Sequence, residues 1–145
     1  VVTCDDTVFI NRRIEGNFPN YKQLLPDSCT TRATFTVEKL LAGVKRVSLL
    51  GSATSAIRQN LNNATQTMQI SSIQHDVGSA QETVNGLIEG EDIEIGFNYH
   101  YVTDGLSAVR GDSVTVEVLN PLKPGIFREE GEESYLYLLM PVRDQ

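Results

Sequence analysis

Two segments that alternate apolar and polar residues constrain the fold more than any other feature of this sequence. Residues 92–102 read DIEIGFNYHYV and residues 113–119 read SVTVEVL. Alternation with a period of two places every second side chain on one face, as in a strand with one buried side. Antiparallel sheets commonly have one face in water, whereas parallel sheets are covered on both. The chain is therefore expected to be mainly β.

The connection between these two segments predicts a β-hairpin. Asp104-Gly105 is a dipeptide typical of a two-residue hairpin turn. If it forms the turn, Ile95 faces Val114 and Ile93 faces Val116. The apolar faces of the two strands then coincide, and this agreement favours the register.

Weaker strand patterns flank this hairpin, and one segment favours a helix. The helix is predicted around 53–65, where Ile57 and Leu61 share a side and Ser52 could cap the start. The turn-rich stretch 11–29 predicts a long loop, and no internal repeat is visible. Further strands are predicted at 1–10, 30–40, 68–77 and 134–140.

These elements predict an antiparallel two-sheet sandwich, with a small β-barrel as the alternative. The chain has 145 residues, the size of one ordinary domain. We therefore expect residues 1–145 to form a single β-rich domain with at most one short helix.

Charge restricts the partners that this chain can be expected to bind. The formal net charge is −7, and Lys and Arg do not cluster in any segment. Nucleic-acid binding needs a positive footprint, so the sequence predicts no nucleic-acid partner. No apolar run approaches the ~20 residues of a membrane span, so no membrane insertion is predicted. The expected partner is another protein or further copies of the same chain.

Two cysteines and one sequon favour an extracellular setting. Cys4 and Cys29 are the whole cysteine content, and the chain opens with Val1 rather than Met. An even, small count in a processed chain predicts one disulfide. That bridge would close a loop of about 25 residues and stabilise the fold by roughly 3.5 kcal/mol. The alternative is two free thiols in a cytosolic protein. Asn63 opens an Asn-Ala-Thr glycosylation sequon.

Residues 110–113 read RGDS, a tetrapeptide that many integrins bind. In the hairpin register, Arg110 falls opposite Tyr99 and Asp112 opposite Phe97. The motif would then be a structural part of the sheet. If the ladder instead stops near Val114, an exposed loop bent at Gly111 could present Arg110 and Asp112 to a receptor. The structural interpretation is favoured, and Arg110, Gly111 and Asp112 are the candidate binding residues.

No motif for catalysis, metal binding or cofactor binding is present. The serines and cysteines have no base beside them in the sequence. The two histidines, His75 and His100, show no spacing that demands a metal site. We therefore predict no catalytic residue, no metal and no cofactor.

The sequence as a whole predicts a non-enzymatic extracellular module for protein interaction or adhesion, secreted or at the cell surface. A disulfide-bonded glycoprotein fits that expectation. One alternative is a structural subunit of a surface filament or sheath, assembled by strand exchange through 1–10 or 134–140. A second alternative is a secreted inhibitor or small-ligand binder, with the tyrosine-rich face of 97–101 lining a pocket.

Overall fold

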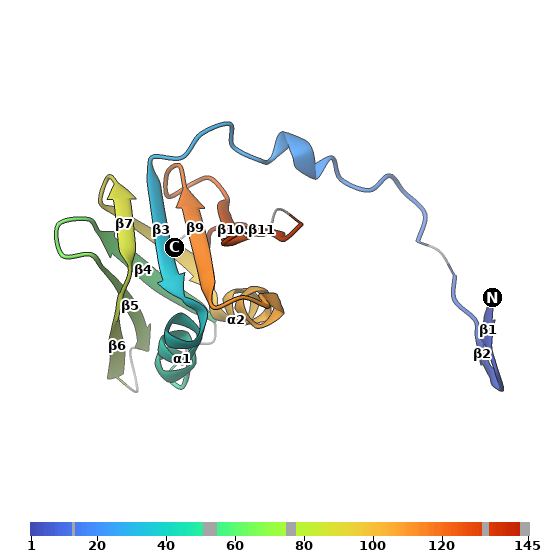
Figure 1. Ribbon diagram of the computed structural model, residues 1–145. Coiled ribbons are helices and arrows are strands. Elements are labelled where there is room, and N and C mark those ends of the chain that lie inside the picture. The colour runs from blue at the N-terminus through green and yellow to red at the C-terminus, as the bar shows by residue number, and fades with distance from the viewer. Residues whose placement is uncertain (13, 51–54, 75–77, 132–133, 143–145) are drawn as a thin grey trace.

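The computed structural model describes residues 1–12, 14–50, 55–74, 78–131 and 134–142. It begins with an extended arm that leads away from the body of the molecule (Figure 1). The arm carries a small hairpin of β1 and β2 and a single 3-10 turn, η1, before the chain enters the body near Thr30. The elements of the arm are β1 (Val2–Cys4), β2 (Thr7–Phe9) and η1 (Tyr21–Gln23).

Over its described residues, the body contains two antiparallel sheets and two helices. The strands order as β11-β10-β9-β3-β7 in one sheet, here sheet B, and as β6-β5-β4-β8 in the other, sheet C. Helices α1 and α2 lie side by side at one end of the sheets (Figure 1). The elements are β3 (Thr31–Thr36), α1 (Val37–Ser48), β4 (Ala56–Asn62), β5 (Thr67–Gln74), β6 (Gly78–Asn85), β7 (Leu87–Gly90), β8 (Ile93–Asn98), α2 (Tyr99–Ala108), β9 (Ser113–Val118), β10 (Gly125–Glu129) and β11 (Leu136–Leu139).

The body is built from two similar units that exchange their first strands. Each unit runs strand, helix, three strands: β3-α1-β4-β5-β6 and β8-α2-β9-β10-β11. The first strand of each unit pairs with the second strand of the other, β3 with β9 and β8 with β4. Neither sheet is complete without a strand from the other unit, so the two units must fold as one core.

The first residues of the two helices also form reciprocal contacts between the units. Thr36 and Asn98 are extended, with φ and ψ of −67° and 124° and of −70° and 121°, and each leads directly from a strand into a helix. The first helical N–H then donates across to the other unit. Val37 N donates to the Asp112 carbonyl at 2.8 Å, and Tyr99 N donates to the Ser55 carbonyl at 2.9 Å.

The predicted β class is confirmed, because the described residues are mainly antiparallel strands with few helices. The plain sandwich and its barrel alternative are wrong, because two helices supply one layer of an α/β fold. The helix predicted around 53–65 is also wrong: β4 occupies that stretch, and Ile57 and Leu61 point into the core at alternating positions. The strand predicted at 30–40 is confirmed only in part: β3 ends at Thr36, and α1 begins at Val37.

The hairpin predicted at Asp104-Gly105 is wrong because those residues lie in the middle of α2. Val102, Gly105 and Leu106 are buried at helical spacing, and the Asn98 side chain accepts from His100 N at 2.9 Å to cap the helix. Glycine is needed at 105 for packing rather than for a turn, because a Cβ there would lie 2.7 Å from the Tyr137 ring. Strands β8 and β9 therefore belong to different sheets.

The disulfide prediction is wrong, since both cysteines are free. Cys4 is exposed on β1, at the far end of the arm (Figure 1), whereas Cys29 comes two residues before β3 of the body. A disulfide needs Cα atoms within about 7 Å of each other, and the extended arm keeps the two residues apart.

One polar side chain is buried in the core without a hydrogen-bond partner among the described residues. Gln59 on β4 is 1% exposed and lies between Ile70 and Ile95 of the neighbouring strands. Neither its Oε1 nor its Nε2 has a hydrogen-bond partner among the described residues. A buried polar group without a partner costs roughly 1–3 kcal/mol of desolvation.

Replacing this amide by an apolar side chain of similar size is expected to stabilise the chain. Gln59→Met should raise the free energy of unfolding by about 2 kcal/mol in urea denaturation, because it removes the unpaired polar atoms and keeps the volume. Gln69→Met, at an exposed position of β5, serves as the control and should change stability by about 0.5 kcal/mol at most. Destabilisation by Gln59→Met would show that the amide is satisfied in solution.

Candidate functional site

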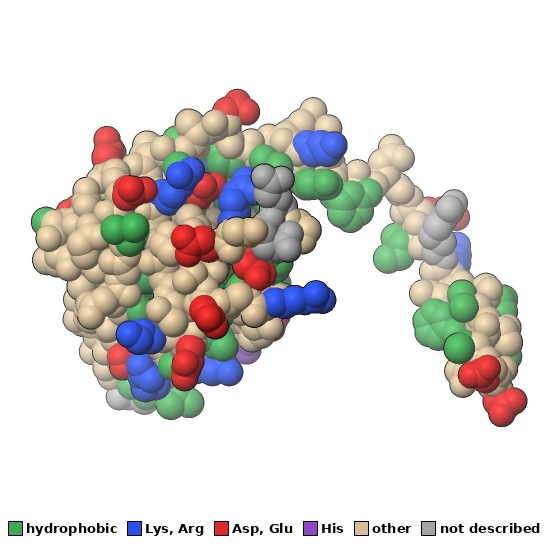
Figure 2. Space-filling model, in the orientation of Figure 1, with side chains coloured by type: hydrophobic (Ala, Val, Ile, Leu, Met, Phe, Trp, Pro, Cys, Tyr) green, Lys and Arg blue, Asp and Glu red, His purple; other side chains and the backbone are tan. Residues whose placement is uncertain are grey.

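In the layer formed by the two helices, α1 presents three basic side chains to solvent. Lys39, Lys45 and Arg46 are exposed on α1, where Glu38 is the single acid. Blue side chains gather over α1 at the lower end of the body in Figure 2, with acidic neighbours among them. On a chain with a net charge of −7, α1 thus exposes three cationic groups along one helix.

One of these cations is held by the neighbouring sheet. Arg46 Nε donates to Glu82 Oε1 of β6 at 2.8 Å. This hydrogen bond raises the pKa of Arg46 and lowers the pKa of Glu82. Beside the pair, a groove of about 370 Å³ separates α1 from β6. Its lining is Glu38, Lys39, Ala42, Arg46, Thr83, Val84 and Asn85.

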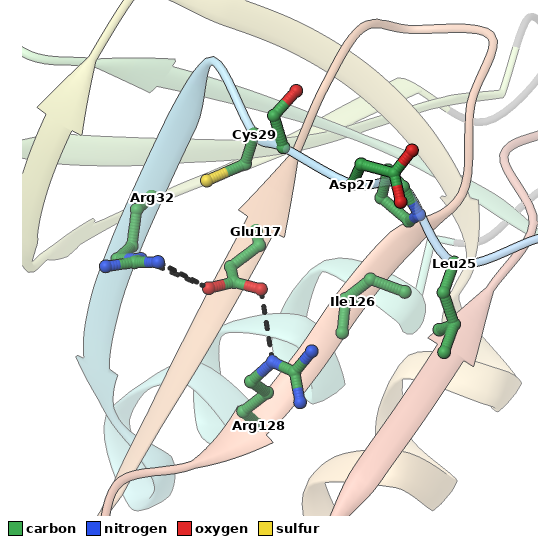
Figure 3. Close-up of a pocket in the computed structure, with 9 residues that line it drawn as sticks. Leu25, Asp27, Cys29, Arg32, Glu117, Ile126 and Arg128 are labelled. Carbon is green, nitrogen blue, oxygen red and sulfur yellow. Dashed lines mark hydrogen bonds and ion pairs between the residues drawn. The ribbon is translucent and has the colours of Figure 1, made fainter. Parts of the chain in front are cut away.

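A second concave site lies on the outer face of sheet B, where the arm crosses it (Figure 3). The pocket has a volume of about 390 Å³. Arm residues 25–29 form one wall, and side chains of β3, β9 and β10 form the floor. The floor side chains are Arg32, Glu117, Ile126 and Arg128.

The charged groups of this pocket bind one another. Glu117 lies between two guanidinium groups, as the dashed lines of Figure 3 show. Arg32 donates from Nε and Nη2 to Glu117 Oε1 at 3.1 and 2.9 Å, and Arg128 Nε donates to Glu117 Oε2 at 3.1 Å. The hydrogen bond to Glu117, followed by its charge, raises the pKa of Arg32. The network joins three adjacent strands and is structural in character.

Removing the shared carboxylate should therefore destabilise sheet B. The Glu117 side chain is 16% exposed, so its ion pairs are more buried than ordinary surface pairs but are not fully buried. Glu117→Gln leaves two guanidinium groups without a counter-charge, and we expect a loss of about 1–2 kcal/mol in urea denaturation. The loss should shrink at high salt.

Glu94→Gln is the matched control for this prediction. Glu94 is 54% exposed and lies 4.0 Å from Arg58. Its replacement should cost about 0.5 kcal/mol or less. Equal effects of the two substitutions would contradict a specific role for the Glu117 network.

The Arg110-Gly111-Asp112 motif forms the loop between α2 and β9. Arg110 and Asp112 are exposed. Arg110 N donates to Glu129 Oε2 at 3.2 Å, and the Asp112 carbonyl accepts from Val37 N. The motif is thus neither opposite Tyr99 nor part of a hairpin, and it lies beside the start of α1.

The remaining predicted sites are dispersed. Asn63 lies in the turn between β4 and β5, where its Nδ2 atom donates to the Gly90 carbonyl at 2.8 Å. His75 lies outside the described residues. Among the described residues no three or more His, Cys, Asp or Glu side chains gather to hold a metal ion. No helix in the described part of the chain is long and apolar enough to cross a membrane.

Several solved structures that this one resembles are DNA polymerase sliding clamps. The structure resembles that of the sliding clamp of Bacillus subtilis with a TM-score of 0.85 and 26% identity, over 91% of this chain and 35% of that one. It also resembles the DNA polymerase III β subunit of Thermotoga maritima with a TM-score of 0.86, over 90% of this chain and 35% of that one. At 23% identity the second likeness shows the fold alone.

Sequence comparison narrows this class to one family. The family model for the DNA polymerase III beta subunit, C-terminal domain, matches residues 22–143, so the chain belongs to this family. The beta sliding clamp of Synechococcus elongatus is 30% identical over 139 residues, which cover 95% of this chain and 37% of the relative. The beta sliding clamp of Staphylococcus aureus is 29% identical over 136 residues, with 93% and 36% covered. The chain spans about a third of the length of these relatives.

Family membership overturns the functional predictions made from the sequence. The extracellular adhesion module and its two alternatives, a surface-filament subunit and a secreted inhibitor, are wrong for a domain of a DNA polymerase subunit. The secreted, cell-surface and glycoprotein expectations are wrong for the same reason. The prediction of no nucleic-acid partner is also wrong, because the chain belongs to the family of a DNA polymerase subunit.

Proposed function

We propose that this chain is the C-terminal domain of a β sliding clamp, a non-enzymatic processivity factor that keeps DNA polymerase III on its template inside the cell. The family match over residues 22–143 carries this proposal. Relatives named beta sliding clamp that align over nearly the whole chain support it. That residues 1–145 form one domain stays a prediction, which the range of the family model supports for most of the chain.

The helix layer is the surface best suited to face DNA. A protein that slides must contact phosphates without reading bases, so exposed Lys and Arg side chains suffice. Lys39 and Lys45 are exposed on α1 and have no carboxylate partner among the described residues. The basic side chains of the outer face, by contrast, are bound to Glu117. Two cations of α1 remain unpaired beside the paired Arg46, whereas Arg32 and Arg128 are both paired, and this difference favours DNA on the helix side.

The edge of sheet C suits assembly with a further subunit. Strand β6 pairs with β5 over its whole length, and its other edge has no partner strand among the described residues. It contains no Lys or Pro, the residues that commonly protect an edge. Leu49, just after α1, is 83% exposed. We infer that a strand of a neighbouring subunit extends sheet C at β6.

The arm suits contact with the rest of the clamp. Val2, Val8 and Phe9 of its hairpin are about 60% exposed, at 64%, 58% and 60%. A two-stranded hairpin alone is marginally stable in water. Residues 1–21 precede the match to the C-terminal domain model, although the relatives align over most of this stretch. We infer that the hairpin packs against a preceding part of the clamp.

Removing the two free α1 cations should weaken DNA binding by the full-length protein. Each lost phosphate contact reduces the slope of log K against log salt by about 0.9 for duplex DNA. Lys39→Gln with Lys45→Gln should therefore reduce the slope by about 2 if both contact phosphates, measured by fluorescence anisotropy with duplex DNA at several salt concentrations.

The control removes the same charge elsewhere. Lys22 lies on the arm and Lys123 between β9 and β10, away from the helices. Lys22→Gln with Lys123→Gln should leave the slope unchanged. Equal slopes for both double variants would show that DNA does not face the helix layer, and absence of any salt-dependent binding by the unaltered protein would contradict the clamp function.

A further inference from the structure

We propose that Arg110, in the loop between α2 and β9, contacts the phosphate backbone of DNA. This inference rests on the proposed clamp function and assigns a binding residue to it. It also gives the Arg110-Gly111-Asp112 motif a role other than adhesion. Contact with phosphate oxygens carries no sequence information, as sliding requires.

The backbone of this loop is held in place from two sides. Glu129 of β10 accepts from Arg110 N at 3.2 Å, and its carboxylate approaches the next residue closely. A Cβ at Gly111 would lie 2.8 Å from Glu129 Oε1, so glycine admits the carboxylate without displacement. On the far side, the Asp112 carbonyl accepts from Val37 N at 2.8 Å. The loop is therefore tied to β10 and to the start of α1.

The Arg110 side chain is left out of this network. It is exposed and has no carboxylate partner among the described residues, whereas Arg32 and Arg128 donate to Glu117, and Arg46 donates to Glu82. Its backbone N–H alone has a partner in the part of the chain that the structure describes. A guanidinium on a fixed backbone with free donors is well suited to phosphate, since it offers a planar fork of N–H groups.

The position of the loop places Arg110 on the helix layer. The loop follows the last turn of α2 and bonds to the first residue of α1, and the two helices lie side by side. Arg110 thereby joins Lys39 and Lys45 as a free cation on the layer proposed to face DNA. Lys123, by comparison, follows the other end of β9.

Acidic neighbours limit the strength of the contact. Asp112 is exposed two residues away, and the Glu129 carboxylate lies against the loop backbone. Like charges near a phosphate-binding cation repel the phosphate, and screening at physiological salt acts only over about 8 Å, so these two carboxylates reduce the attraction. A weak contact is what a sliding protein needs, because a strong one would hold it at one place.

The test compares three single variants of the full-length protein with duplex DNA, by anisotropy over a range of salt concentrations. Arg110→Gln should reduce the slope of log K against log salt by about 0.9. Lys123→Gln, the charge-matched control at the opposite end of β9, should not change it. Asp112→Asn should tighten binding at low salt, because it removes the nearest competing charge while keeping the backbone carbonyl that binds Val37.

The outcomes separate this inference from the function on which it rests. Salt-dependent binding that Lys39→Gln with Lys45→Gln weakens and Arg110→Gln leaves unchanged would overturn the role of Arg110 and keep the clamp function. Absence of DNA binding by the unaltered protein would overturn both. Because the Arg110 side chain has no protein partner among the described residues, its replacement should leave the melting temperature unchanged, and this measurement excludes loss of folding as the cause.

Discussion

The exchange of first strands between the two units is the interaction on which the rest of this structure depends. β3 completes the sheet of the second unit, and β8 completes the sheet of the first. Because each strand leads directly into a helix, the exchange also brings α1 and α2 together on one layer. The first N–H of each helix then bonds to the loop of the opposite unit. Strand pairing therefore creates the helix layer proposed to face DNA.

The sequence predicted the mainly β character because alternation is a local signal, and β8 and β9 carry it clearly. It did not predict which strands pair, since pairing depends on contacts between distant segments. Asp104-Gly105 was misinterpreted because the same dipeptide serves a turn or a closely packed helix, and only Tyr137 distinguishes them. The repeat did leave a signal in the buried residues: one constant offset relates Phe35 to Phe97 and Gly43 to Gly105.

The candidate site was harder to predict than the fold because charge was assessed along the chain. Lys39 and Lys45 are diluted by neighbours of both signs, and Arg110 lies in another unit altogether. Folding gathers them on one layer and leaves the net charge of −7 unchanged. Net charge is therefore a poor guide to DNA binding when several cations gather on one surface.

The presence of unpaired cations, more than the number of cations, distinguishes the two faces, although Arg46 of α1 is itself paired with Glu82. On sheet B, Arg32 and Arg128 both donate to Glu117, so their positive charges are already balanced within the protein. On the helix layer, Lys39, Lys45 and Arg110 have no carboxylate partner among the described residues and remain available to an external anion. The Arg-Gly-Asp motif combines internal bonding and an available cation within three residues. Its backbone binds Glu129 and Val37, and the Arg110 guanidinium remains available to a partner. A motif that resembles an adhesion signal in the sequence is thus explained by the loop that supports the helix layer.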